Sequence, residues 1–353
     1  MRIGSLCTGY GGLDMAVQSV FGGSLAWWSD IESGPIKVMQ HHHPEAPNLG
    51  DLTTVDWSTV EPVDILTAGY PCQPFSNAGK RRGTDDPRHI WPWISRAIGV
   101  LRPRFVVLEN VAAHVRRGFD VVSEDLAALG YDAAWSVVRA SDVGAPHRRE
   151  RLYVVAADTS EGGRGGWTDE NLWESLGNPT GGHLSTSDPS GVGWREGRPE
   201  SARVVGGPRT AKRGSQAVAN PDGLGVRAEQ VSESRCGRSA VSGFSGEGTG
   251  FDWQQYTPAI RRWEAVLGVP APRPDARGPR GGLKVNPAFA EWLMGVPGRI
   301  TSVPGLSINE QLRLAGNGVV PQQADHAIRG NLSRLSWLTD NPERTYNYGV
   351  PTK

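Results

Sequence analysis

The residue whose setting most favours chemistry is a cysteine between two prolines. Cys72 lies in a Pro-Cys-Gln-Pro segment (71–74) that directly follows the apolar run 63–68. A free cysteine usually packs as a small apolar side chain, but here the prolines restrict the backbone after a strand. A thiol in such a loop can act as a nucleophile once a base or positive charge lowers its pKa. The basic residues 80–82 and Arg88 could supply that charge or could contact phosphate.

Further charged side chains lie where two other apolar runs meet polar sequence. Glu109 follows the run 105–108, and a carboxyl at a strand end can donate a proton or anchor a ligand. Arg149 and Arg151 alternate just before the run 152–156, so an extended backbone would point both guanidinium groups to one side. Two such groups could hold an anionic or carbonyl-bearing ligand. A solvated basic edge is the alternative interpretation.

A glycine-rich turn and two acids are typical of a nucleoside site. Residues 7–12 (Cys-Thr-Gly-Tyr-Gly-Gly) follow the apolar run 2–6, and such a turn lets a cofactor approach the backbone closely. Asp30, after the run 24–28, could accept hydrogen bonds from ribose hydroxyls, and Asp51 could accept one from an adenine amino group. Taken alone, the turn could be a plain tight turn and the acids exposed loop residues.

These residues need a sheet that gathers strand ends at one edge. Over residues 1–157, short β-branched runs alternate with helical spacing at 14–20, 93–101 and 121–129. This alternation predicts an α/β fold with a mostly parallel sheet covered by helices on both faces. Ligands then bind at the carboxyl ends of the strands. The predicted strands are the runs 2–6, 24–28, 63–68, 105–108 and 152–156.

The composition changes after residue 158. Residues 161–250 hold 20 of the 46 glycines and few apolar runs, which favours a linker or a small loop-rich domain. Several large aromatic residues in this stretch favour partial order. Helical patterns return at 289–294, 309–314 and 322–328. We therefore predict a first domain at 1–157, a separate region at 158–285, a return to the first domain at 286–338, and a polar tail at 339–353.

The motifs occur in one order: glycine-rich turn, two acids, Pro-Cys-Gln, Glu-Asn-Val, Arg-x-Arg, a long variable stretch and Gly-Asn-Gly-Val-Val. This series resembles the DNA (cytosine-5)-methyltransferase family over residues 1–157 and about 286–330. The resemblance implies a Rossmann-like, S-adenosylmethionine-dependent methyltransferase sheet with helices on both faces. It also implies a smaller, loop-rich target-recognition domain at 158–285. The implied reaction moves a methyl group from S-adenosylmethionine to C5 of a flipped-out cytosine in a specific duplex DNA sequence.

The resemblance also implies a role for each motif residue. Cys72 would add to C6 of cytosine, Glu109 would hold the N3 and amino edge, and Arg151 with Arg149 would hold the carbonyl side. No metal ion is implied. The cofactor would be bound by residues that stand at the family's motif positions: Cys7, Thr8, Gly9, Gly11, Gly12, Asp30, Ile31, Asp51, Gly69, Pro71, Trp91, Asn317 and Val319.

Three positions depart from the family pattern. Cys7 stands where the family usually has Phe, which would weaken one packing contact with the cofactor. His147 stands where Gln is usual. Gly318 replaces a common Ser, which would loosen the turn near the C-terminus. None of these changes affects Cys72 or Glu109.

Composition is compatible with this interpretation. Thirty-seven basic and 37 acidic residues give zero net charge, but acids prevail in 1–60 and basic residues in 80–88, 198–213 and 270–284, so basic surface is local. Three cysteines cannot make a disulfide framework. No apolar run reaches the ~20 residues of a membrane span. We expect a monomeric protein of a bacterial or phage-infected cytoplasm, with duplex DNA as partner and a cognate restriction endonuclease acting separately.

Two alternatives share the catalytic motifs. One is an RNA cytosine-5 methyltransferase, which the long insert disfavours. The other is a catalytically inactive DNA-binding relative, which the intact set of Cys72, Glu109 and Arg151 disfavours. A nicotinamide-dependent oxidoreductase would need the spacing Gly-x-Gly-x-x-Gly, and the turn at 7–12 does not have it.

Overall fold

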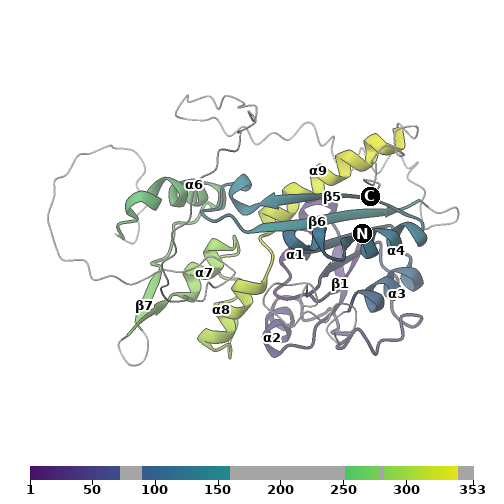
Figure 1. The fold of residues 1–353 in the computed structure, drawn as a ribbon. Helices are drawn as coiled ribbons and strands as arrows, with labels where there is room; N and C mark the ends of the chain where they lie inside the picture. The colour runs from purple at the N-terminus through teal and green to yellow at the C-terminus, as the bar shows by residue number, and fades with distance from the viewer. Residues whose placement is uncertain (72–89, 160–250, 278–281, 341–353) are drawn as a thin grey trace, which may run out of the picture. The chain divides into compact units, whose positions relative to one another are not determined.

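The computed structural model describes residues 1–71, 90–159, 251–277 and 282–340, with side chains described to residue 335. These residues lie in one of the two units into which the chain divides, 1–177 with 241–353; the other, Asn178–Ala240, lies outside them. One sheet of six strands organises the described residues (Figure 1). Its strand order is β2-β1-β3-β4-β6-β5. The strands are β1 (Arg2–Leu6), β2 (Ser24–Ser29), β3 (Ile65–Gly69), β4 (Phe105–Val111), β5 (Tyr131–Arg139) and β6 (Glu150–Asp158).

The sheet has two halves with different strand directions. Strands β1, β2, β3 and β4 pair in parallel, and we call them the parallel half. Strand β6 pairs antiparallel with both β4 and β5, and we call β6 and β5 the antiparallel half. The sequence pattern had predicted neither β5 nor the direction of β6. Strand β5 is an edge strand with exposed positions, so it shows no continuous apolar run.

The connection between β5 and β6 explains the change of direction. Only residues 140–149 join the two strands, and the only helix among them is the short 3₁₀ helix η3 (Ala140–Val143). A parallel neighbour needs a crossover of a dozen or more residues, usually through an α-helix. The short connection therefore leaves antiparallel pairing as the available arrangement.

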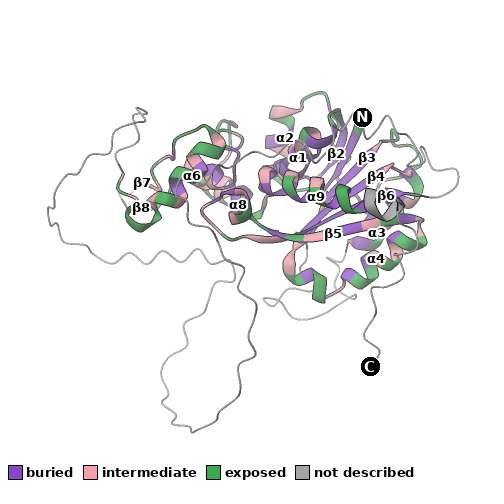
Figure 2. Cartoon of the chain, turned by 90° about the horizontal axis from the view of Figure 1, so that it is seen from above, coloured by how far each residue is buried: buried purple, intermediate pink, exposed green. Residues whose placement is uncertain are grey.

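Helices cover both faces of the sheet, as predicted. Odd-numbered residues of β4, such as Val107, face a core that includes Val17 of α1 (Gly12–Phe21) and Ile328 of α9 (Pro321–Asp340). Even-numbered residues, such as Val106, face the helices on the other side (Figure 2). Those helices are α3 (Trp91–Leu101) and α4 (Phe119–Ala128). This alternation is the ordinary consequence of a strand with both faces buried.

A third core lies among the C-terminal elements. Trp263 of α6 (Thr257–Leu267) and Trp292 of α7 (Pro287–Leu293) are fully buried, and the Trp263 indole N–H donates to the Trp292 carbonyl. The remaining elements are α2 (Ser33–His42), η2 (Ala112–Arg116), η4 (Gln254–Tyr256), β7 (Asp275–Arg277), β8 (Leu283–Val285) and α8 (Ile308–Asn317). None of the helices described is both long and apolar enough to cross a membrane.

Candidate active site

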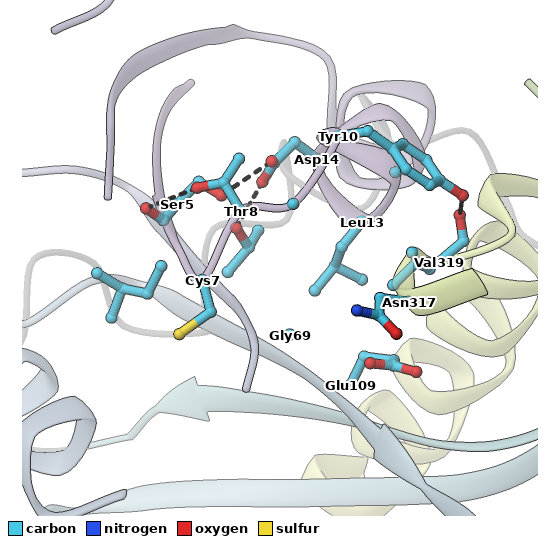
Figure 3. A pocket seen from close by; sticks show the side chains of 15 residues that line it. Ser5, Cys7, Thr8, Tyr10, Leu13, Asp14, Gly69, Glu109, Asn317 and Val319 are labelled. Carbon is cyan, nitrogen blue, oxygen red and sulfur yellow. Dashed lines mark hydrogen bonds between the residues drawn. The ribbon is translucent and has the colours of Figure 1, made fainter. Parts of the chain in front are cut away.

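A pocket lies at the carboxyl ends of β1, β3 and β4, where four separate segments of the chain meet (Figure 3). It brings together the turn after β1, the end of β3, the middle of β4 and the segment that follows α8. Eight of the predicted site residues line it: Cys7, Thr8, Gly9, Gly12, Gly69, Glu109, Asn317 and Val319. Residues more than 300 positions apart in the sequence therefore share one cavity.

The glycine-rich turn is shaped by backbone demands as well as by space. Gly9 and Gly11 have φ of 59° and 79°, the left-handed region that glycine tolerates best. A Cβ at Gly12 would run into the carbonyl oxygen of Val319. Cys7 also has a left-handed φ, 52°, which is unusual for a residue with a side chain. Burial raises the pKa of the Cys7 thiol, so it stays protonated.

Two acids, Asp14 and Glu109, line the pocket. Asp14 is almost fully buried and accepts hydrogen bonds from the hydroxyls of Ser5 (2.8 Å) and Thr67 (2.5 Å). Burial raises the pKa of Asp14, and the two hydroxyls oppose that rise. Asp14 and Glu109 both line the pocket, and no lysine or arginine is among the residues that do. The charge of Arg299 acts on Asp14, and the charges of Arg151 and Arg149 act on Glu109, from outside the lining.

Glu109 and Arg151 form a buried ion pair. Arg151 Nε lies 3.1 Å from Glu109 Oε1, and the two side chains are 15% and 11% exposed. Burial raises the pKa of Glu109, while the charges of Arg151 and Arg149 lower it. The pair depends on the direction of β6. In the antiparallel register Val111 lies opposite Arg151, so the start of β6 meets the carboxyl end of β4.

Arg149 has different partners from Arg151, and the backbone alternation predicted for the two does not hold. It precedes β6 with a left-handed φ of 33°, so the extended backbone that alternation requires is absent there. Its two terminal nitrogens donate to the carbonyls of Gly316 (3.1 Å) and Gly318 (2.5 Å). Arg149 therefore fixes the segment after α8, although its charge still acts on Glu109.

Gly318 does not loosen the C-terminal turn, which is also contrary to the prediction. The ring of Tyr10 occupies the place that a Cβ at Gly318 would take. The Tyr10 hydroxyl donates to the carbonyl of Val319. We call Tyr10, Arg149 and residues 316–319 the clasp, because the two side chains hold that segment against the pocket. Sequence reasoning missed Tyr10, which it treated only as a position inside the turn.

The predicted nucleoside acids lie beside this pocket without lining it. Asp30 Oδ2 accepts from the backbone N–H of Gly9 at 3.0 Å, which links the acid to the glycine-rich turn. Ile31, next in sequence, is 69% exposed. Asp51 is exposed, and its Oδ1 accepts from the N–H (2.9 Å) and hydroxyl (2.8 Å) of Thr53. Asn48, which sequence reasoning missed, contacts the turns of both acids; an Asn in a turn is the signal that was available.

The predicted residues around the cysteine are only partly described. Cys72 itself and the basic residues 80–82 and 88 lie outside the described residues. Pro71 is exposed at the edge of that gap. Tyr70, before it, is held by Asn110, whose amide donates to the Tyr70 carbonyl at 3.2 Å. Gly11 lies in the turn but does not line the pocket.

The side chains of Trp91 and His147 each donate a hydrogen bond to another part of the chain. Trp91 is buried at the start of α3, where its indole N–H donates to Asp125 at 2.7 Å, and it does not line the pocket. His147 donates from Nε2 to the Leu293 carbonyl at 2.9 Å, which ties the segment before β6 to α7. Burial lowers the pKa of His147. In the part of the chain that is described, no three His, Cys, Asp or Glu side chains gather as a metal site.

Comparison with known proteins gives a family for this arrangement. Residues 1–174 match the model of the C-5 cytosine-specific DNA methylases. The chain is 35% identical over 141 residues to the type II methyltransferase M.NlaIV of Neisseria lactamica, covering 36% of this chain and 33% of that protein. It is 33% identical over 160 residues to M.HhaI of Haemophilus parahaemolyticus, covering 44% and 48%.

The sequence matches therefore span about a third to a half of the length of these curated relatives. The structure also resembles the S. pombe Dnmt2 methyltransferase, with a TM-score of 0.53 and 16% identity, covering 95% of this chain and 99% of that one. That likeness concerns the fold alone. The comparisons therefore identify residues 1–174 as similar to the family of C-5 cytosine-specific DNA methylases.

Proposed function

We propose that this chain is a DNA (cytosine-5)-methyltransferase. It transfers a methyl group from S-adenosylmethionine to C5 of a flipped-out cytosine in a specific duplex DNA sequence, through a covalent bond between Cys72 and C6. The observation that carries the proposal is the buried pair of Glu109 and Arg151 beside the glycine-rich turn. Gly69, which lines the same pocket, precedes Cys72 by three residues in sequence.

The described residues fit the cofactor. S-Adenosylmethionine, when bound, supplies an electrophilic methyl group on a positively charged sulfur, and the carboxyl groups of Asp14 and Glu109 suit that charge. Gly9 has a left-handed φ, and a Cβ there would meet no atom within 4 Å, so its backbone is open to close approach. Asp30 would accept from the ribose hydroxyls, exposed Ile31 would pack on adenine, and Asp51 would accept from its amino group. Asn317 and Val319 would close the methionine end.

Glu109 and Arg151 would act on the base. Cytosine C5 is a weak nucleophile until the Cys72 thiolate adds at C6, which forms an S–C6 bond and moves the ring electrons towards C5. Because burial raises the pKa of Glu109, that carboxyl can share a proton with N3 and stabilise the ring during addition. Arg151 fixes the carboxyl and would face the base carbonyl. After C5 has taken the methyl group, loss of the C5 proton and cleavage of the S–C6 bond restore the aromatic ring and the thiolate.

Access to C6 requires the base to leave the duplex. We propose that residues 158–285 recognise the DNA sequence; of these, helix α6 and the β7–β8 hairpin are described. We further propose that the protein acts as a cytoplasmic monomer, with a cognate restriction endonuclease acting separately.

A methyl-transfer assay with matched substrates tests the proposal. The full chain is incubated with tritiated S-adenosylmethionine and either bacterial genomic DNA or tRNA, and Cys72→Ser is the control. We expect label in DNA alone, lost in the variant, and bisulfite sequencing that places 5-methylcytosine within one sequence context. Label in tRNA alone would favour the RNA enzyme. A wild-type chain that binds 5-fluorocytosine-containing DNA without forming a covalent adduct would identify an inactive relative and overturn the proposal.

A further inference from the structure

Residues 46–50 run along the end of β2 and bring two distant turns together. The Trp28 N–H donates to the Pro47 carbonyl (3.0 Å), and the Leu49 N–H donates to the Trp28 carbonyl (2.7 Å). Trp28 and Asn48 thereby form an isolated parallel bridge. This short addition to the sheet places the turn of Asp51 beside the turn of Asp30, although 21 positions separate them in the sequence.

The Asn48 side chain joins the two turns, beside the Ser29 hydroxyl, which donates to the Gly50 carbonyl (2.7 Å). Asn48 Oδ1 accepts from the N–H of Asp30 (3.2 Å) and from the N–H of Gly50 (3.0 Å). Asn48 Nδ2 donates to the Asp30 carbonyl (3.0 Å). The amide therefore uses both its acceptor and its donor on backbone atoms. An aspartate at this position would lack the donor, and an alanine would lack both groups.

We propose that Asn48 is a positioning residue for the adenosine end of the cofactor, because it sets the spacing between the carboxylates of Asp30 and Asp51. The inference rests on the proposed function. A ribose and an adenine are held by two acids together only if the separation of the acids matches the nucleoside. If that separation is fixed before the ligand binds, less conformational entropy is lost on binding than if the two loops were mobile. Asn48 need not touch the ligand to have this effect.

A second acid, Asp56, makes the same local hydrogen bonds as Asp51 but lies in a different turn. Asp56 Oδ1 accepts from the N–H (3.1 Å) and hydroxyl (2.7 Å) of Ser58, just as Asp51 Oδ1 accepts from Thr53. Asp56 instead lies within reach of the charge of Arg96 on α3. Because the two acids have equivalent local hydrogen bonds, only their placement relative to Asp30 can distinguish them. Asp56 is therefore a matched control.

The test measures binding of S-adenosylhomocysteine and of 5′-methylthioadenosine, which lacks the amino-acid end, by calorimetry. Asn48→Ala should weaken both ligands by the same factor of about 10, the effect of about 1.4 kcal/mol from lost hydrogen bonds. Asn48→Asp, which keeps the acceptor and adds a charge, should also weaken both. Asp56→Asn should leave both affinities unchanged. In the methylation assay, Asn48→Ala should raise the KM for S-adenosylmethionine with kcat within about twofold.

A double variant separates positioning from general stability. If Asn48 acts through Asp51, then Asn48→Ala should weaken binding far less in an Asp51→Asn background than alone, because coupled residues are not additive. Full additivity would overturn the inference, as would unchanged 5′-methylthioadenosine affinity in Asn48→Ala. A parallel loss of kcat and melting temperature in both Asn48 variants would show a merely structural role. If the wild-type chain binds neither ligand, the proposed function fails instead.

Discussion

The two halves of the sheet deliver residues to the same edge in different ways. In the parallel half, β1, β2 and β3 all end at that edge, so their residues come from the turn that follows each strand. In the antiparallel half, β6 begins there, so Arg151 reaches Glu109 from the start of its strand. We therefore propose that the two functions are separated in the sheet. The parallel half binds the cofactor, and the residues where the two halves meet act on the base.

Replacing Arg151 is the strongest way to test that division. Arg151→Ala leaves the buried carboxyl of Glu109 without its ion-pair partner. We expect kcat for methylation to fall by about 10²–10³, the usual effect of losing a key electrostatic group. The affinity for S-adenosylhomocysteine should change by less than about threefold. Arg148→Ala is the control, because Arg148 is 75% exposed and pairs with Glu150. An equal loss of cofactor affinity in Arg151→Ala would contradict the division.

The clasp lies where both halves contribute, so changing it should affect both functions. Gly318→Ala would drive a methyl group into the Tyr10 ring. We expect a loss of unfolding free energy of about 1–3 kcal/mol in urea titrations, as for other overpacked sites. Cofactor affinity and methylation rate should fall together. Gly316→Ala is the matched control, because no atom lies within 4 Å of the Cβ that it adds. Equal behaviour of the two variants would show that the clasp accepts the methyl group.

The smallest effect should come from a contact at the outer side of the parallel half. His43 accepts a hydrogen bond from Arg299 (3.1 Å). Burial, with the charges of Arg299 and His42, lowers the pKa of His43 to about 4. An unfolded histidine titrates near 6.5, so on acidification the unfolded chain takes up the proton first. Stability should therefore be lost as the pH falls from about 6.5 to 4.

Scanning calorimetry at pH 7 and pH 5 checks this expectation. His43→Gln should reduce the drop in melting temperature between the two pH values by a few degrees. His41→Gln is the control, because His41 is exposed and lies in α2, which ends just before His43. A drop that is the same in His43→Gln and wild type would assign the acid sensitivity to other groups.

The sequence predicted the parts of this fold that depend on local pattern. Strand β1 has the predicted bounds, and the other predicted strands lie within or overlap the observed ones, because each has closely spaced apolar residues that are buried on both faces of the sheet. Strand β5 was missed because an edge strand has no such run, and α2 was missed because its composition is mixed. The direction of β6 depends on the length of a connection, which periodicity does not record.

The residues of the candidate site also fall into those that the sequence predicted and those that it did not. Motif residues such as Glu109 and the glycine-rich turn were found because their types and order carry information. The alternation predicted for Arg149 and Arg151 fails because one left-handed residue breaks the strand pattern, and the role of Arg149 towards the base stays a prediction. Asn48 and Tyr10 were missed because their contacts are with backbone atoms that only the folded chain brings near. The assignment of Cys72 stays a prediction, since it lies outside the described residues.

The packing of α9 against α1 and the sheet also has a consequence for synthesis. The last strand of the sheet is complete at Asp158, but the helix that covers Val17 and its neighbours spans 321–340. At 5–20 residues per second, a ribosome needs roughly 10–35 s to make the intervening chain. Throughout that interval α1 covers that apolar face of the nascent sheet without α9, and the pocket lacks Val319. We therefore expect the apolar residues beneath α9 to stay exposed, and the pocket to stay incomplete, until translation has passed α9.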